Sequence, residues 1–186
     1  LTREAVTAAL ADAGAGVGDI EAAWFANTAQ SILEGQNAIP GEIALRNIGI
    51  QNVPVTNVEN ACASASTALD MAATWLEAGR GGVALSIGAE KMFSENRELM
   101  FKVFDGGWDV HDVAGATERL LALGEGMSDP DGESDTGQRS VFMDVYGALA
   151  KFHMKNFGTT QAQLAAVAAK NHDHSVHNPL SQYRVP

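Results

Sequence analysis

Helical and strand-like patterns alternate over residues 1–92, and this alternation restricts the chain to a small set of folds. Helices are expected at residues 2–13, 35–50 and 65–79, and strands at residues 20–27, 53–59 and 81–90. Because parallel strands are joined by crossover helices, this order predicts an α/β fold with a mostly parallel sheet and helices on both faces.

Residue type and spacing predict two details of these helices. Thr2 stands where its hydroxyl can cap the first helix. In the third helix, Leu69, Leu76 and one of the alanines between them (Ala72 or Ala73) recur at helical spacing. We therefore expect the leucine-bearing side of this helix to be buried.

The composition changes after residue 92. Residues 104–138 are rich in glycine and aspartate and have no sustained period, so we expect a long irregular excursion with one short helix. Two helices follow, one over about residues 140–156 and one opened by Thr160, which with Gln163 fits a capping box. We divide the chain into an α/β core, residues 1–92, and a second domain, residues 93–186.

Charge and composition exclude several classes of protein. The net charge of −11 argues against a nucleic-acid-binding protein, which needs a basic surface for phosphates. No apolar run approaches the roughly 18 residues of a membrane span, and no signal-peptide pattern is present. A single cysteine cannot form an internal disulfide. We therefore expect a cytoplasmic protein, and its abrupt ends lead us to expect a longer native chain.

The single cysteine, Cys62, lies in the run "VENACASAST", where a strand-like pattern changes to a helical one. At such a junction, free N–H groups and the positive end of the helix dipole favour a thiolate. Small neighbouring residues let a substrate approach the sulfur. A free cysteine is also a common core residue, so from the residues alone a nucleophile and a buried structural cysteine both stay open.

Histidines offer two further candidate sites. His172, His174 and His177 lie close together, but on a helix they do not share a face, so we predict no metal site. His111 and Asp112 are adjacent in sequence and should point apart. We expect them in a surface loop rather than as a catalytic pair.

Three quoted segments resemble the thiolase superfamily. "VENACASASTALDMA" followed by "GVALSIGAEKMF" resembles the acyl-accepting segment of that superfamily. The region "YGALAKFHMKNFGTTQAQLAAVAAKNHDHSVHNPLSQYR" is similar to the loop domain of thiolases of the sterol-carrier-protein type, which include lipid-transfer-protein and acetyl-CoA acetyltransferase-like members. The resemblance implies a thiolase-like layered fold (αβαβα) that is incomplete here: residues 1–92 form the N-terminal core, residues 93–186 the loop domain, and the C-terminal half is absent.

The resemblance also implies an enzyme, an acyl-CoA C-acyltransferase that forms or cleaves a 3-oxoacyl-CoA. Cys62 would be the catalytic nucleophile and would carry the acyl group, with its own backbone N–H in an oxyanion hole. Met143 roughly matches a family methionine beside the acyl-CoA pocket, although core packing is the alternative for a methionine on a helix. Coenzyme A and its acyl thioester are expected as substrates, with no permanently bound cofactor, and the family implies a homodimer or tetramer.

Two departures from the family keep alternatives open. Ala65 stands where many thiolases have glycine, and the family's histidine and second cysteine belong to the absent half. One alternative keeps the fold and makes the protein a retro-aldolase on steroid-side-chain CoA thioesters, with a small OB-fold, zinc-ribbon partner subunit. Another is a non-catalytic acyl-CoA- or lipid-binding scaffold.

Overall fold

A computed structural model describes residues 1–128 and 141–185 of the chain. The chain forms two compact units, Leu1–Gly107 and Trp108–Pro186. The helix α5 (Arg97–Asp105) belongs to the first unit and was not expected from the sequence. The separation into family domains at residues 92 and 93 stays a prediction. Part of the predicted excursion, residues 129–138, lies outside the described residues.

The first unit contains a three-stranded parallel sheet, which confirms the predicted fold class. Its strands are β1 (Ala22–Ala26), β2 (Val55–Val58) and β3 (Ala84–Gly88), in the order β2-β1-β3. Both neighbours run parallel to β1, with Trp24 opposite Thr56 on one side and Ser86 on the other. The central strand is buried along its whole length, as its continuous apolar sequence requires.

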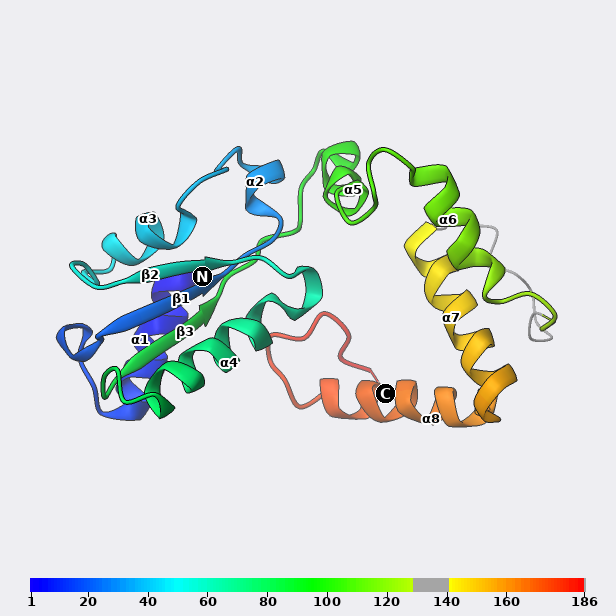
Figure 1. The fold of residues 1–186 in the computed structure, drawn as a ribbon. Coiled ribbons are helices and arrows are strands. Elements are labelled where there is room, and N and C mark those ends of the chain that lie inside the picture. Colours follow the sequence, from blue (N-terminus) through cyan, green and yellow to red (C-terminus); the bar gives the residue numbers. More distant parts are fainter. Residues whose placement is uncertain (129–140, 186) are drawn as a thin grey trace. The chain divides into compact units, whose positions relative to one another are not determined.

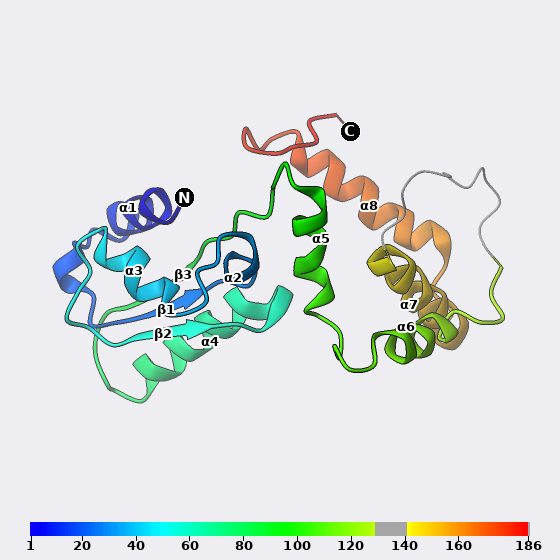
Figure 2. The ribbon, with the colours of Figure 1, turned by 90° about the horizontal axis from the view of Figure 1, so that it is seen from above.

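Helices cover both faces of this sheet (Figures 1 and 2). The helices α1 (Thr2–Ala13) and α3 (Pro40–Arg46) lie on one face, and α4 (Ser64–Glu77) lies on the other. The short helix α2 (Gln30–Leu33) packs against α5. Two single 3₁₀ turns complete the unit: η1 (Val17–Asp19) and η2 (Ala61–Ala63).

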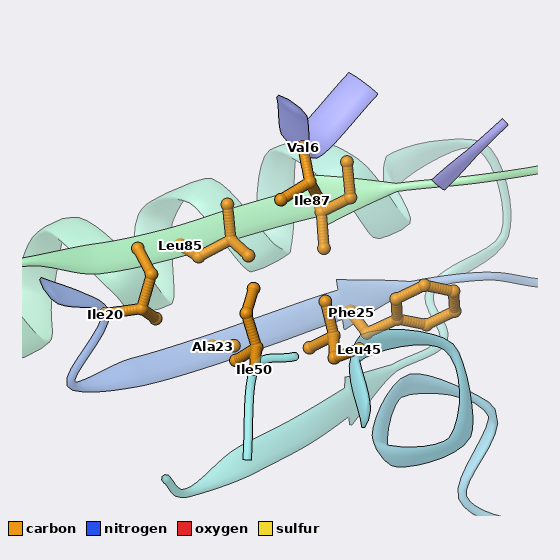
Figure 3. Close-up of a cluster of buried hydrophobic side chains, with 8 residues drawn as sticks. All are labelled: Val6, Ile20, Ala23, Phe25, Leu45, Ile50, Leu85 and Ile87. Carbon is orange, nitrogen blue, oxygen red and sulfur yellow. The ribbon is translucent and has the colours of Figure 1, made fainter. Parts of the chain in front are cut away.

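Two apolar clusters form the core, one on each face of the sheet. Alternate residues of β1 serve the two clusters because successive side chains of a strand point to opposite faces. The cluster under α1 and α3 contains Val6, Ile20, Ala23, Phe25, Leu45, Ile50, Leu85 and Ile87 (Figure 3). The cluster under α4 contains Ala22, Trp24, Ala26, Val58, Ala68 and Ala72.

The predicted buried side of α4 is wrong for its two leucines and right for Ala72. Leu69 is 62% exposed and Leu76 is 38% exposed, whereas Ala68 and Ala72 are buried. The helix packs against β1 and β3, and Trp24 and Val58 of the sheet fill this face, so the helix contributes its small side chains there. The larger leucines therefore point away from this sheet.

The expected cap of α1 is also absent. Thr2 is the first helical residue, and Leu1 occupies the cap position without a side-chain hydrogen bond. By contrast, the N-terminus of α5 has a side-chain cap, because Asn96 Oδ1 accepts a 3.1 Å hydrogen bond from the Leu99 amide.

The second unit is helical among the residues that the structure describes. It contains α6 (Val113–Ala122), α7 (Val141–Phe157) and α8 (Gln161–Ser175), and α6 packs against α7. The predicted capping box is confirmed: Thr160 Oγ1 accepts from the Gln163 amide at 3.3 Å, and Gln163 Oε1 accepts from the Thr160 amide at 2.8 Å. None of the helices described here has the length and apolar character needed to cross a bilayer.

Candidate active site

The carboxyl ends of the three strands meet at one edge of the sheet. Asn27 and Thr28 follow β1, Glu59 and Asn60 follow β2, and Glu90 lies just beyond β3. In open parallel sheets this edge is where ligands bind. The segment that carries Cys62 starts from it.

Cys62 lies in the middle of η2, directly ahead of α4, and its side chain is exposed. The sequence interpretation of Cys62 as a buried core residue is therefore excluded, while its role as a nucleophile stays a prediction. The residues before and after Cys62, Ala61 and Ala63, are also exposed, and both have small side chains. Two hollows on the described surface lie elsewhere, one beside Trp24 and Trp75 and one along α6.

The backbone before Cys62 adopts an uncommon conformation. Ala61 has a φ of 46°, in the left-handed region that side chains other than glycine rarely occupy. Glu59 Oε1 accepts a 2.7 Å hydrogen bond from the Ala61 amide, and the Ala63 amide donates to the Asn60 carbonyl at 2.9 Å. Within residues 1–128 and 141–185, no acceptor is paired with the amide of Cys62, which leaves this N–H available to a ligand.

The buried hydroxyl of Ser64 is hydrogen-bonded to the backbone of this turn. Ser64 Oγ accepts a 2.7 Å hydrogen bond from the Asn60 amide and donates to the Ala61 carbonyl at 2.8 Å. The hydroxyl of Thr28 lies 3.2 Å from the same oxygen. Residues on both sides of the cysteine and the end of the central strand therefore share one hydrogen-bond network.

Glu90 joins the end of β3 to the turn after β1. Its Oε2 accepts from the Thr28 amide at 2.8 Å, and its Oε1 accepts from the Ala29 amide and from Asn27 Nδ2, both at 3.1 Å. The sequence analysis missed Thr28, Ser64 and Glu90. The available signal was their position, since Thr28 and Glu90 follow predicted parallel strands and Ser64 begins the predicted helix.

The other residue expected at the site, Met143, lies in the first turn of α7 and is 62% exposed. It belongs to the second unit, whereas Cys62 belongs to the first. Its exposure excludes the alternative of core packing within the described residues. A role beside an acyl-CoA pocket stays a prediction.

The histidine candidates lie apart from this site in sequence. His172 and His174 lie on α8 and His177 follows it, and the His172 ring stacks on Tyr183 with 5.6 Å between centroids. In the part of the chain that is described, no three histidine, cysteine or acidic side chains form a group suited to a metal ion.

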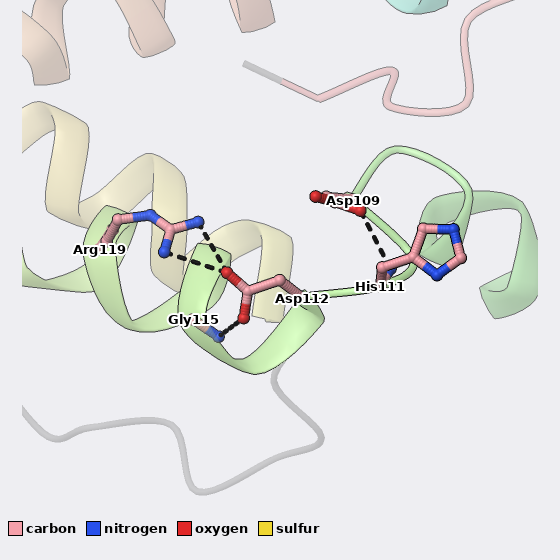
Figure 4. Close-up of polar contacts among 5 residues, drawn as sticks. All are labelled: Asp109, His111, Asp112, Gly115 and Arg119. Atoms are coloured by element: carbon pink, nitrogen blue, oxygen red, sulfur yellow. Dashed lines mark hydrogen bonds and ion pairs between the residues drawn. The ribbon is translucent and has the colours of Figure 1, made fainter.

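Asp112 and His111 have separate surroundings (Figure 4). Asp112 caps α6 by accepting a 3.1 Å hydrogen bond from the Gly115 amide, and it also pairs with Arg119 at 3.1 Å. The His111 amide donates to Asp109 Oδ1 at 3.0 Å, and the imidazole points away from Asp112. Asp112 therefore acts as the N-terminal cap of α6, and His111 lies in the exposed turn before it.

Comparisons with known proteins agree with this architecture. The family "Thiolase, N-terminal domain" matches residues 1–184. Non-specific lipid-transfer protein-like 2 of Caenorhabditis elegans is 31% identical over 183 residues, which cover 98% of this chain and 40% of that protein. Sterol carrier protein 2 of Bos taurus is 31% identical over 184 residues, which cover 99% of this chain and 30% of that protein.

An enzyme is also among the relatives. Acetyl-CoA acetyltransferase of Methanothermobacter thermautotrophicus is 29% identical over 180 residues, 97% of this chain and 40% of that protein. The chain thus spans 30% to 40% of the length of these three relatives. The match along nearly the whole chain confirms the resemblance stated from the sequence: the chain belongs to the thiolase family, of which it carries the N-terminal domain.

Proposed function

We propose that this chain carries the nucleophile of an acyl-CoA C-acyltransferase that forms or cleaves a 3-oxoacyl-CoA, with Cys62 as that nucleophile. One observation carries the proposal: in a thiolase-family chain, the single cysteine is exposed between a strand and a helix at the carboxyl edge of the parallel sheet. The name of the acetyl-CoA acetyltransferase relative supports the same reaction class.

The proposed chemistry begins with attack of the Cys62 sulfur on a thioester carbonyl. With acetyl-CoA, a bond forms between Sγ and the acyl carbon, the bond from that carbon to the CoA sulfur breaks, and the thiol proton passes to CoA. With a 3-oxoacyl-CoA, the bond that breaks is the carbon–carbon bond next to the attacked ketone, and the proton goes to the departing acetyl-CoA carbanion. The unpaired Cys62 amide is available to stabilise the oxyanion.

Incubation with acetyl-CoA followed by intact-mass measurement tests the proposal. We expect one acetyl group on the wild-type protein, located on Cys62 by peptide mapping. Cys62→Ser is the matched variant, because it keeps the size of the side chain and replaces the sulfur by a far weaker nucleophile. An adduct that persists in Cys62→Ser, or a wild-type protein that stays unmodified, contradicts the proposal.

A second candidate function is a lipid- or acyl-CoA-binding scaffold without turnover. The names of two relatives, a sterol carrier protein and a lipid-transfer protein, favour it. The scaffold predicts that acyl-CoA quenches tryptophan fluorescence without forming an adduct and that iodoacetamide labels Cys62 slowly. Rapid labelling near neutral pH together with an acetyl adduct selects the enzyme.

We further propose that copies of the chain associate through the N-terminal sheet into a homodimer or tetramer. The strand β2 lies at the edge of the sheet and exposes Thr56 and Asn57. Edge strands readily pair with another chain through their free backbone groups. Sedimentation velocity over a range of concentrations tests this: a monomer throughout contradicts it.

A further inference from the structure

Ser64 has surroundings that differ from those of every other polar side chain near Cys62. It is the first residue of α4, lies two positions after the cysteine, and is only 6% exposed. Among the described residues, it is the one polar side chain counted in the buried core. A buried hydroxyl is costly unless its hydrogen bonds are made, so the partners of Ser64 define what it does.

The Ser64 hydroxyl has three hydrogen-bonding neighbours, one of which, the Thr28 hydroxyl, also donates to the Ala61 carbonyl at 3.4 Å. A serine hydroxyl has one donor and two acceptor lone pairs. The donor serves the Ala61 carbonyl at 2.8 Å, one lone pair accepts from the Asn60 amide at 2.7 Å, and the other faces the Thr28 hydroxyl at 3.2 Å. Two of these three partners are backbone groups of the two residues before Cys62, the Asn60 amide and the Ala61 carbonyl.

These two partners belong to the strained part of the turn. Ala61 has its φ at 46°, a conformation that the surrounding structure must impose on a residue with a Cβ. Ser64 holds the Ala61 carbonyl and the Asn60 amide one residue earlier, while the Ala61 amide itself donates to Glu59 Oε1 at 2.7 Å. The Ala61 carbonyl and the Cys62 amide share one peptide plane, so fixing the carbonyl also sets the direction of the Cys62 N–H.

The third partner anchors Ser64 to the sheet. Thr28 follows the central strand, and its own amide donates to Glu90 beyond β3 at 2.8 Å. The position of the cysteine turn is thereby tied to the ends of two neighbouring strands. Because strand ends are rigid, we expect this support to hold the cysteine turn in one orientation.

We infer that Ser64 is a positioning residue of the Cys62 nucleophile, since its buried hydroxyl holds the carbonyl of the strained residue Ala61 and so aims the Cys62 thiol and amide. This inference rests on the proposed acyl transfer. It assigns Ser64 no contact with substrate. Loss of the hydroxyl should slow the acylation step while leaving the binding of acyl-CoA unchanged.

The chain offers a matched control in Ser66. Its hydroxyl also donates to a backbone carbonyl three residues earlier, that of Ala63, at 2.9 Å, but Ser66 is exposed and touches neither Asn60 nor Ala61. Ser64→Ala and Ser66→Ala therefore remove the same chemical group from the same turn of helix. They differ in burial and in whether the group is bonded to the Asn60–Ala61 backbone, so urea unfolding of both variants accompanies the rate measurements.

The first measurement is the rate of acetyl adduct formation against acetyl-CoA concentration. We expect Ser64→Ala to lower the maximal rate at least about tenfold, the effect of a small misplacement of a reacting group, with the half-saturating concentration within about twofold of wild type. Ser66→Ala should match wild type, and Ser64→Thr, which keeps the hydroxyl, should recover most of the rate. An unchanged maximal rate in Ser64→Ala overturns the inference.

A second pair of variants covers the case in which Ser64→Thr does not fold because of its added methyl group. Thr28→Val removes the hydroxyl that faces Ser64 and nearly keeps the shape of the side chain. Thr28→Ser keeps the hydroxyl and removes only the methyl group. We expect slower acylation in Thr28→Val and recovery in Thr28→Ser. Equal rates in these two variants count against the network.

The second measurement separates this inference from the proposed function. Iodoacetamide alkylates Cys62 without any acyl-CoA, and we expect Ser64→Ala to be alkylated at least about threefold more slowly than wild type and Ser66→Ala. If the wild-type protein forms no acetyl adduct, the proposed acyl transfer fails, and the alkylation rates still decide the inference. Equal alkylation of all three proteins overturns it.

Discussion

The amide of Gly41 donates a 2.7 Å hydrogen bond to Asn57 Oδ1, and this bond fixes the first turn of α3 against the edge strand β2. A Cβ on Gly41 would lie 2.6 Å from the Cβ of Phe25 and 2.8 Å from Asn57 Oδ1. Neither neighbour can retreat easily, because Phe25 is in the buried central strand and Asn57 is held by this same bond. The close approach of α3 to the sheet therefore requires glycine here.

Gly41→Ala should destabilise the first unit by about 1–3 kcal/mol through overpacking. Urea unfolding followed by tryptophan fluorescence in a Trp108→Phe background measures this, since the other two tryptophans, Trp24 and Trp75, lie in the first unit. Gly18→Ala is the control, because a Cβ on Gly18 would meet nothing within 4 Å. If the two variants unfold at the same urea concentration, the clash is not real.

Ala68→Leu should also destabilise the first unit, by about 1–3 kcal/mol or more. Ala68 lies on the side of α4 that faces the sheet and is 0% exposed. The three extra carbons of a leucine side chain must therefore displace the strands or the helix. Ala73→Leu is the control on the exposed side of the same helix, where alanine and leucine differ little in helix propensity. Urea midpoints of the two variants give the comparison, and a smaller loss in Ala68→Leu would contradict the close packing.

Glu21 should make stability depend on pH in the acid range. Hydrogen bonds from the Gly82 amide, which has the larger effect, and from the Val83 amide hold the pKa of Glu21 below its usual value. Desolvation raises this pKa by less than they lower it. A lowered folded-state pKa means that this contribution is complete above the ordinary value of 4.5 and is lost as pH falls through the folded-state pKa. Its charge ties the start of β3 to the residue before β1.

Glu21→Gln should therefore be less stable than wild type at pH 7 and should lose less of its remaining stability between about pH 5 and pH 3. Urea midpoints measured across this range test both statements, and an NMR titration of the Glu21 carboxyl reports its pKa directly. The exposed Glu34→Gln serves as the control for a lost carboxylate. Parallel pH profiles for wild type and Glu21→Gln would contradict the assignment.

Asp112 should stabilise α6 mainly as a cap and only slightly as an ion pair. Asp112→Ala removes the acceptor of the Gly115 amide, which should cost about 1 kcal/mol locally and speed the exchange of that amide about fivefold. Asp112→Asn keeps the cap and loses the exposed pair with Arg119, so it should stay near wild type. Hydrogen exchange at Gly115 distinguishes them, with Asp109→Ala as the nearby control. Equal exchange in Asp112→Ala and Asp112→Asn would contradict the capping role.

Some of the fold follows from local pattern. The short apolar stretch at residues 20–27 predicts a strand, and it contains the buried central strand β1, Ala22–Ala26. The Thr160 and Gln163 pair predicts the start of α8, because a capping box needs only residues three positions apart. Such features depend on neighbours in sequence, and neighbours in sequence are what a pattern contains.

The buried side of α4 shows where pattern stops. Leu69 and Leu76 recur at helical spacing, and so do Ala68 and Ala72, so two adjacent sides of one helix both fit a buried stripe. Hydrophobicity favours the leucines, whereas the structure packs the alanines against the sheet, whose side chains include the large Trp24. The side chains that the strands present to the helix decide this, and the periodicity of the helix does not describe them.

The sequence by itself determined the strand–helix alternation, the parallel sheet and the strand-to-helix change at Cys62. Each of these can be predicted from the periodicity and type of residues that are neighbours in sequence. Only the tertiary structure decided what surrounds that cysteine. Thr28 and Glu90 are 62 positions apart in sequence, yet parallel pairing brings the strand ends that carry them together, and Thr28 in turn reaches Ser64. The reason is physical: hydrogen bonds depend on distance in space, and the register of the sheet, not the order of the chain, sets that distance.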